Sequence, residues 1–375
     1  MNLLESEAKY LFRKYGISTP HGLVFHDLKG IEGSLVNLRF PLMVKAQTSQ
    51  GGRGKAGGIR TALSREEALE WSGRILNMQI AGMKVHAVLL EEMIDAAKEM
   101  YLAITIDQIT RCPVLLAGCA GGMDVEGMPA KTIKRWSLDP LESMPLSVLE
   151  QASHFLVRDG PGSMGVRSTI TSMWRIFRQM DCELVEINPL MITESGKAIA
   201  ADAKVSIDDE ALFRHPNMAV KASRDLTELE RLAKDKGFQL VELPGDIGVL
   251  ANGAGLTMAV LDTLQRFGGQ GGTFLDLGGT DDPARISEAL SLLSYDLARG
   301  RIRSILVCIF GGITKCDSVA EALMMTVIDK KVKARTVVRL RGNNEEDAVK
   351  MLCLAGFNVH LDLDEACMQS VKVKG

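Results

Sequence analysis

Residues 247–255, with the sequence Ile247-Gly248-Val249-Leu250-Ala251-Asn252-Gly253-Ala254-Gly255, decide the fold of the last third of this chain. The five apolar residues predict a short buried strand. The glycines after them let the chain turn tightly into a helix that we expect from residue 256 to 267. A strand, a glycine turn and a helix in this order begin a unit in which parallel strands alternate with helices.

The same alternation continues to the end of the chain and predicts a doubly wound parallel sheet over residues 239–375. A polar helix at 225–237 and the pair Pro244-Gly245 mark the boundary with the residues before it. The further elements are expected at strand 273–276, helix 283–297, strand 304–310, helix 316–329, strand 335–340, helix 344–354, strand 357–360 and helix 363–372.

A second glycine turn, Gly311-Gly312-Ile313-Thr314, follows the strand at 304–310 and opens the next helix. Both turns lie at carboxyl ends of parallel strands, where open α/β sheets bind ligands. The free N–H groups of a helix start suit a carboxylate or a phosphate. Such turns also occur simply to reverse the chain, so these residues alone leave both interpretations open.

Residues 1–238 mix helices and strands without strict alternation, which predicts an α+β domain. An amphipathic helix is expected over 2–15. The other elements are expected at strand 42–46, helix 64–77, strands 86–91, 100–107 and 113–117, helices 146–158 and 166–180, strand 183–187, and a hairpin that returns to Asp202.

A glycine-rich loop, Gly51-Gly52-Arg53-Gly54-Lys55-Ala56-Gly57-Gly58, follows the strand at 42–46. Glycines leave backbone N–H groups open to phosphate, and Arg53, Lys55 and the preceding Lys45 add positive charge. The loop leads into a strand and lacks the Gly-Lys-Ser/Thr ending, so it is not a Walker A loop. A flexible hairpin with a solvated Lys45 is the alternative.

Glu186-Ile187-Asn188-Pro189 stands at a strand end, and Asp202 lies fourteen residues after Asn188 on the returning strand. A hairpin of that length can bring Asn188 and Asp202 side by side. Amide and carboxylate oxygens with water and phosphate oxygens around them are what Mg²⁺ prefers. The alternative is a turn asparagine and a strand-end aspartate paired with Lys204.

Composition excludes several classes of protein. The net charge of −3 over 375 residues argues against nucleic-acid binding through a basic surface. No apolar run reaches the roughly 18 residues of a membrane helix. The acidic stretch Met1–Glu7 does not resemble a secretory leader, and the seven cysteines include no Cys-x-x-Cys pair. We therefore expect a cytoplasmic protein with reduced thiols and no membrane or nucleic-acid partner.

The sequence resembles the β subunits of succinyl-CoA synthetases, which are ATP-grasp acid–CoA ligases. The resemblance covers almost the whole chain, with its motifs in family order. The matching stretches are Lys45 with Gly51–Gly58, Glu91 through Glu99, Glu186–Leu190, Asp202–Lys204, Ala211–Arg214, Asn252–Gly255, Phe274–Gly279, Phe310–Ile313 with Cys316-Asp317, and Arg341–Asn344.

The resemblance implies an ATP-grasp domain over 1–238, a flavodoxin-like CoA-ligase domain over 239–375, and roles for single residues. Asn188 and Asp202 would hold Mg²⁺, and Glu186 would lie beside a phosphorylated histidine. The residues implied to bind nucleotide are Lys45, Gly52, Arg53, Gly54, Glu91, Ile94 and Glu99. Those implied to hold the acyl carboxylate are Asn252, Gly312, Ile313 and Thr314. Pro20 favours ATP over GTP.

The resemblance also implies a partner. In this family an α subunit carries the phosphohistidine and the CoA site, and the two subunits form a heterodimer or a heterotetramer. The β chain binds Mg-ATP and a small carboxylic acid, and it is inactive alone. The alternatives are the same machinery acting on malate, citrate or a sulfonated acid, a non-catalytic nucleotide-binding paralogue, and a ligase that needs no partner.

Departures from the family pattern cluster at the acyl end of the site. Thr314-Lys315 stands where succinate enzymes carry Val-Arg, and Gly278-Gly279-Thr280 replaces a triple glycine. A threonine hydroxyl adds a hydrogen-bond donor, and a lysine offers a point charge in place of a forked guanidinium. The identity of the acid therefore stays open.

Overall fold

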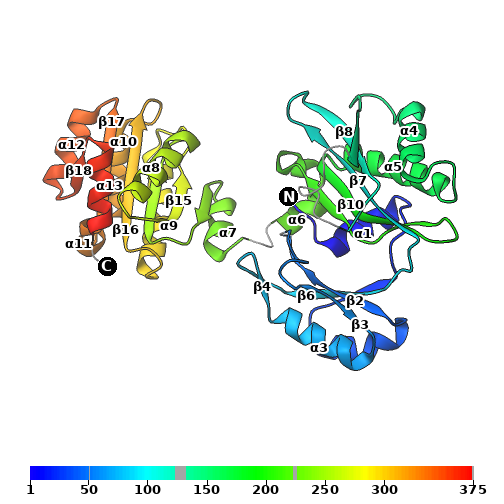
Figure 1. The fold of residues 1–375 in the computed structure, drawn as a ribbon. Helices are drawn as coiled ribbons and strands as arrows, with labels where there is room; N and C mark the ends of the chain where they lie inside the picture. Colours follow the sequence, from blue (N-terminus) through cyan, green and yellow to red (C-terminus); the bar gives the residue numbers. More distant parts are fainter. Residues whose placement is uncertain (50, 123–131, 223–225, 374–375) are drawn as a thin grey trace. The chain divides into compact units, whose positions relative to one another are not determined.

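The computed structural model describes residues 1–49, 51–122, 132–222 and 226–373 (Figure 1). These residues separate into two compact units, Met1–Ala222 and Ser223–Gly375. The division expected from the sequence leaves helix α7 (Glu228–Asp235) in the first domain. In the structure α7 contacts strand β13 (Gln239–Glu242) and helix α9 (Pro283–Ala298), so it packs with the second unit.

The first unit contains a small antiparallel sheet with the strand order β1-β6-β2-β3. Helix α3 packs on β2, β3 and β6, and the Ser64 hydroxyl caps it by accepting a bond from the Glu67 N–H. Apolar side chains such as Val44, Ile75 and Leu90 fill the space between helix and sheet. The elements are β1 (Gly22–Phe25), α2 (Leu28–Ser34), η1 (Leu35–Asn37), β2 (Leu42–Gln47), β3 (Ile59–Ala62), α3 (Arg65–Leu76), β6 (Ala87–Glu92) and the short ribbon β4 (Gln79–Ile80) with β5 (Met83–Lys84).

A larger antiparallel sheet completes the first unit. Its strand order is β11-β10-β7-β8-β9, and β12 also pairs with β10. Helix α5 packs on β7, β10 and β11, α4 packs on β8, and α1 contacts α5 and β12. The elements are α1 (Glu5–Lys14), β7 (Lys98–Asp107), β8 (Cys112–Gly118), β9 (Ile133–Ser137), α4 (Leu146–Val157), α5 (Ser163–Gln179), β10 (Cys182–Ile192), β11 (Ala198–Ala200), β12 (Lys204–Ile207), η4 (Asp209–Arg214) and α6 (Pro216–Ala222).

Strand β10 is longer than the sequence predicts, because it does not end at Asn188-Pro189 but continues to Ile192. Glu186 pairs with Lys204 of β12, and Leu190 pairs with Ala200 of β11. The register with β7 shifts between Ile187 and Leu190. A proline is tolerated at such an irregularity because no regular ladder bond is needed from it there.

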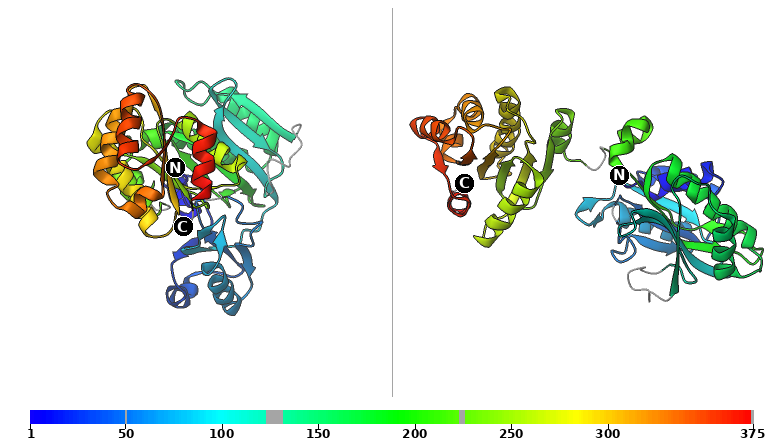
Figure 2. Two further views of the ribbon diagram at one scale, coloured as in Figure 1. Left: turned by 90° about the vertical axis from the view of Figure 1, so that its left-hand side faces the viewer. Right: turned by 90° about the horizontal axis from the view of Figure 1, so that it is seen from above.

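The second unit is a doubly wound α/β sheet, as the sequence predicts (Figure 2). Strands β15, β14, β16, β17 and β18 are parallel, and β13 adds an antiparallel edge. Helices α8 and α13 cover one face, while α9, α10 and α12 belong to the core on the other. The elements are β14 (Ile247–Ala251), α8 (Ala254–Arg266), β15 (Gly271–Asp276), β16 (Ser304–Gly311), α10 (Cys316–Thr326), α11 (Lys330–Ala334), β17 (Thr336–Gly342), α12 (Glu345–Leu354), β18 (Asn358–His360) and α13 (Leu363–Lys372).

Candidate functional site

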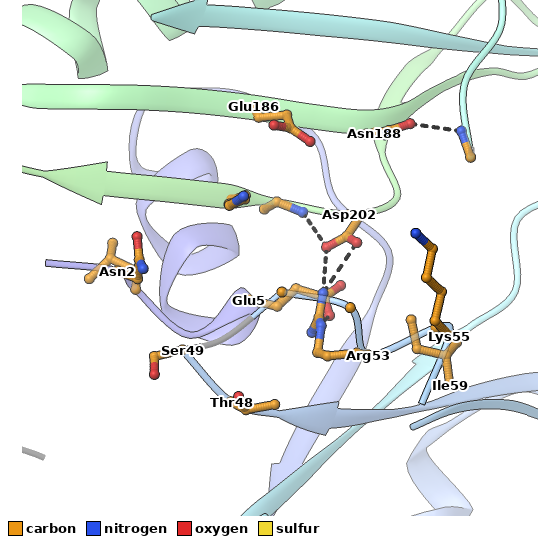
Figure 3. Close-up of a pocket in the computed structure, with 17 residues that line it drawn as sticks. Asn2, Glu5, Thr48, Ser49, Arg53, Lys55, Ile59, Glu186, Asn188 and Asp202 are labelled. Atoms are coloured by element: carbon orange, nitrogen blue, oxygen red, sulfur yellow. Dashed lines mark hydrogen bonds and ion pairs between the residues drawn. The ribbon is translucent and has the colours of Figure 1, made fainter. Parts of the chain in front are cut away.

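A cavity of about 660 Å³ opens in the first unit beside the loop after β2, the N-terminal residues and the β10–β12 hairpin (Figure 3). The loop leads from β2 into β3, which confirms that it is not a Walker A loop. The residues that the sequence predicts for the site and that line this cavity are Gly52, Arg53, Gly54, Glu186, Asn188 and Asp202.

A second cavity of about 460 Å³ adjoins the first, since Asn188 and Asp202 line both. Much of its wall is apolar and comes from Pro20, Met43, Met93, Pro189 and Met191. Four further residues predicted for the site line it, namely Lys45, Glu91, Ile94 and Glu99. The structure therefore gathers around two adjoining cavities all the residues assigned from the sequence to nucleotide, metal and phosphohistidine.

Lys45 is not a solvated surface lysine, because its side chain is only 9% exposed. Its Nζ donates to Glu5 Oε1 at 2.8 Å and to the Ala201 carbonyl at 2.7 Å, and it lies 2.9 Å from Glu91 Oε2. Burial alone would favour the neutral amine, but the carboxylates of Glu5 and Glu91 raise the pKa of Lys45. This ammonium is therefore charged at neutral pH.

Helix α1 brings a second buried lysine to the same carboxylates. Lys9 Nζ lies 2.7 Å from Glu5 Oε1 and 2.5 Å from Glu91 Oε2, and it donates to the Ala201 carbonyl at 2.7 Å. Burial opposes ionisation of Glu5, yet Lys45, Lys9 and Arg53 together hold its pKa well below the usual range. Glu5 is therefore a buried carboxylate surrounded by cations.

Arg53 links this buried cluster to the open cavity. Its Nη1 donates to Glu5 Oε2 at 2.6 Å, and its Nη2 donates to Asp202 Oδ1 at 3.0 Å and Oδ2 at 3.2 Å. Burial and the Glu5 carboxylate raise the pKa of Asp202, while Arg53 opposes them. Asp202 is thus paired with Arg53, and not with Lys204 as the alternative interpretation of the sequence has it.

Asn188 and Asp202 lie opposite each other, because the pairs Glu186–Lys204 and Leu190–Ala200 flank them in the same register. Both side chains line the cavity, as the hairpin length predicts (Figure 3). Asn188 Oδ1 accepts a bond from the Gly122 N–H at 2.8 Å. An amide oxygen and a carboxylate at one cavity wall are hard oxygen donors of the kind that Mg²⁺ takes.

Glu186 is a further acidic group that lines this cavity. Burial is the main reason that the pKa of Glu186 is raised, with Asp202 acting in the same direction and Lys204 opposing both. Among the described residues, no group of three or more histidine, cysteine or acidic side chains is arranged to hold a metal ion. A metal at this wall would therefore be held by the Asp202 carboxylate, the Asn188 amide and oxygen atoms from outside the chain.

In the second unit, Asn252, which follows β14, hydrogen-bonds to the end of β16. Its Nδ2 donates to the Phe310 carbonyl at 2.9 Å, and its Oδ1 accepts from the Phe310 N–H at 2.9 Å. Asp276 holds the adjacent turn by accepting a bond from the Gly253 N–H at 2.7 Å. The side chain of Asn252 therefore positions the loop that begins at Gly311.

The loop residues predicted to hold an acyl group differ in exposure. Ile313 is 75% exposed, whereas Thr314 is fully buried. Within the described part of the chain the Thr314 hydroxyl has no hydrogen-bond partner. The backbone N–H and Nζ of Lys315 both donate to Asp281, at 2.9 and 2.6 Å. The Lys315 charge is therefore engaged by Asp281.

Sequence reasoning missed Glu5 and Lys9, which the structure places in the cation cluster. The signal was present, because both residues share a helix face with Ala8 and Phe12. Opposite charges four residues apart on an apolar face indicate a buried ion pair rather than a solvated one.

None of the helices in the residues that the structure describes is long and apolar enough to cross a membrane.

The chain has the domain order of ATP-grasp CoA ligases. An ATP-grasp domain family matches residues 2–192, and a CoA-ligase family matches residues 250–373. The solved structure of ATP citrate lyase from Methanothrix soehngenii, in complex with citrate and coenzyme A, superposes with a TM-score of 0.77. It covers 99% of both chains at 18% identity, which shows a shared fold.

Curated relatives define the family more narrowly. The chain is 37% identical to the ADP-forming succinate–CoA ligase β subunit of Desulfurococcus amylolyticus, over 100% of this chain and 99% of that one. It is 39% identical to that of Pyrobaculum aerophilum and 35% identical to that of Bacteroides thetaiotaomicron, each over at least 99% of both chains. The chain belongs to the family of ADP-forming succinate–CoA ligase β subunits.

Proposed function

We propose that this chain is the nucleotide- and acid-binding β subunit of an ADP-forming acid–CoA ligase that acts on succinate. The observation that carries the proposal is the pair of adjoining cavities in the first unit. They bring cations, an oxygen-donor wall and an apolar wall together from segments far apart in the sequence. Full-length likeness to succinate–CoA ligase β subunits supports the choice of acid.

The nucleotide lies across both cavities. The apolar one, with Met43, Met93 and Ile94, suits a purine, and Glu91 and Glu99 line the same space. The phosphates lie in the larger cavity against Arg53 and the N–H groups of Gly52 and Gly54, and Lys45 lines the adjoining cavity. Pro20 lines the purine side, and we assign ATP as the nucleotide.

Asn188 and Asp202 would hold Mg²⁺ through their oxygen atoms. The donor set fits the ion because both atoms are hard oxygens on one wall of the phosphate cavity. The ion neutralises phosphate charge when it is bound. Arg53 competes with the ion for Asp202 through its two bonds to that carboxylate.

The reaction proceeds through the α subunit. A histidine nitrogen of that subunit attacks the γ-phosphorus of ATP and ADP leaves. The acid then takes the phosphoryl group to form an acyl phosphate, and the CoA thiol attacks the acyl carbon and releases inorganic phosphate. Glu186 lies at the cavity wall, and its raised pKa suits it to exchange a proton with the imidazole. Lys45 and Arg53 contribute position and charge.

The acid binds at the loop of the second unit. Gly312, Ile313 and Thr314 lie just before the start of α10, where backbone N–H groups suit a carboxylate, and Asn252 holds this loop through Phe310. A hydroxylated or sulfonated acid is the second candidate, favoured by the buried Thr314 hydroxyl that has no partner in the described residues. The two subunits form a heterodimer or heterotetramer in the cytoplasm.

The test is a coupled ADP-release assay with a co-expressed α subunit, CoA and a panel of carboxylic acids. We expect turnover with succinate from the complex and none from this chain alone. Thr314→Val with Lys315→Arg is the matched variant for the second candidate. A shift of kcat/KM toward succinate in that variant would favour another acid. Acid-dependent CoA ligation by this chain without an α subunit would contradict the proposal.

A further inference from the structure

The Nζ donors of Lys45 and the Nη donors of Arg53 are already taken. An ammonium has three hydrogens, and Lys45 Nζ has three oxygens within 2.9 Å, from Glu5, Glu91 and the Ala201 carbonyl. Arg53 Nη1 donates to Glu5 and to the Ala46 carbonyl, and its Nη2 donates to Asp202. A phosphate can therefore gain the Lys45 Nζ or Arg53 Nη donors only by taking the place of an acceptor.

Glu5 is the acceptor that touches both cations. Its Oε1 binds Lys45, its Oε2 binds Arg53, and it lines the phosphate cavity although its side chain is only 1% exposed (Figure 3). Asp202 contacts Arg53 alone among these cations, and Glu91 contacts Lys45 and Lys9. A group that displaces Glu5 therefore reaches both phosphate cations at once.

Lys9 lets Glu5 give up those bonds without becoming an unpaired buried charge. Its Nζ stays 2.7 Å from Glu5 Oε1 from within the same helix, one turn away. Lys9 is 1% exposed and does not line either cavity, so an incoming phosphate does not compete for it. An isolated buried carboxylate would be strongly unfavourable.

We propose that Glu5 is a positioning residue that occupies Lys45 and Arg53 and is exchanged for nucleotide phosphate when nucleotide binds. The proposal rests on the function proposed above. Glu5 holds the two cations in place and competes with the phosphates for them, while Lys9 retains Glu5 after the exchange. Release of Arg53 toward phosphate also frees Asp202 for the metal, so nucleotide and metal bind together.

The test measures nucleotide binding and turnover in Glu5→Gln. Removing the charge with which Glu5 competes for Lys45 and Arg53 should tighten the Kd for Mg-ATP by about tenfold. Inorganic tripolyphosphate, which lacks the purine, should show the same tightening. The kcat of the complex with the α subunit should change much less than the Kd, because Glu5 has already left Lys45 and Arg53 once nucleotide is bound. A purely structural role would weaken binding and would not separate KM from kcat in this way.

Glu7→Gln is the matched control on the same helix, because Glu7 caps α1 and pairs with Lys221 outside the cluster. It should leave nucleotide affinity unchanged. If Glu5→Gln fails to fold, Glu5→Asp keeps the charge but is too short to reach both cations, and it should tighten binding by a smaller factor. Unchanged or weaker binding in a folded Glu5 variant overturns the proposal. Failure of the unmutated chain to bind Mg-ATP would instead overturn the proposed function.

Discussion

Lys9→Met tests whether the buried cluster is balanced in charge. The cluster holds three cations, Lys9, Lys45 and Arg53, and three anions, Glu5, Glu91 and Asp202. Methionine has nearly the volume of lysine, so the variant removes the charge without opening a large cavity.

The expected loss of stability follows from that count. With Lys9 gone, two cations face three anions, and Glu91 keeps only Lys45 as a partner. Removing one partner of a buried ion pair destabilises a protein by roughly 3–5 kcal/mol. With an m value of about 3 kcal/mol/M in urea, the unfolding midpoint should fall by about 1 M or more.

Tryptophan fluorescence of the full chain is the assay. The three tryptophans, Trp71, Trp136 and Trp174, all lie in the first unit, so their emission follows the unfolding of that unit alone. The compensating double variant Lys9→Met with Glu91→Gln leaves two cations and two anions in the cluster. Because the charges balance again, it should recover much of the lost stability. A free energy of unfolding within about 1 kcal/mol of that of the unmutated chain, the range of a surface pair, would refute the reasoning.

Three further predictions concern the metal wall, acid stability and the acyl loop. Asp202→Asn should keep the fold but weaken the Mg²⁺ dependence of nucleotide binding, measured by titration calorimetry at several Mg²⁺ concentrations, because an anionic oxygen is lost. The pKa of Glu5 is depressed, so the stability that ionised Glu5 contributes is complete above its ordinary pKa of 4.5 and is lost as pH falls below that value. In unfolding followed by fluorescence, Glu5→Gln should lose less stability between neutral and acid pH than the unmutated chain does. Thr314→Val should leave the melting temperature of the second unit unchanged or raised, because the buried hydroxyl has no partner in the described residues; a loss of several degrees would show that the hydroxyl is bonded.

The sequence by itself determined the second unit. Its strands and helices alternate, and a local pattern of apolar residues followed by glycines predicts each of them. Edge strand β13 escaped prediction because it is short and only its two central residues, Leu240 and Val241, are apolar. The order of short motifs along the chain also indicated the family, and the hairpin length allowed Asn188 to lie opposite Asp202, as it does in the structure.

Only the tertiary structure decided how the charges are paired. The pairing of Arg53 with Glu5 joins residues 48 positions apart, and its pairing with Asp202 spans 149. No local pattern encodes such contacts, because they depend on how α1, the glycine loop and the β10–β12 hairpin pack. The burial of these charged side chains also depends on tertiary packing. Lys45 and Glu5 are common surface residues by type, and packing of the two sheets removes them from water and makes their partners decisive.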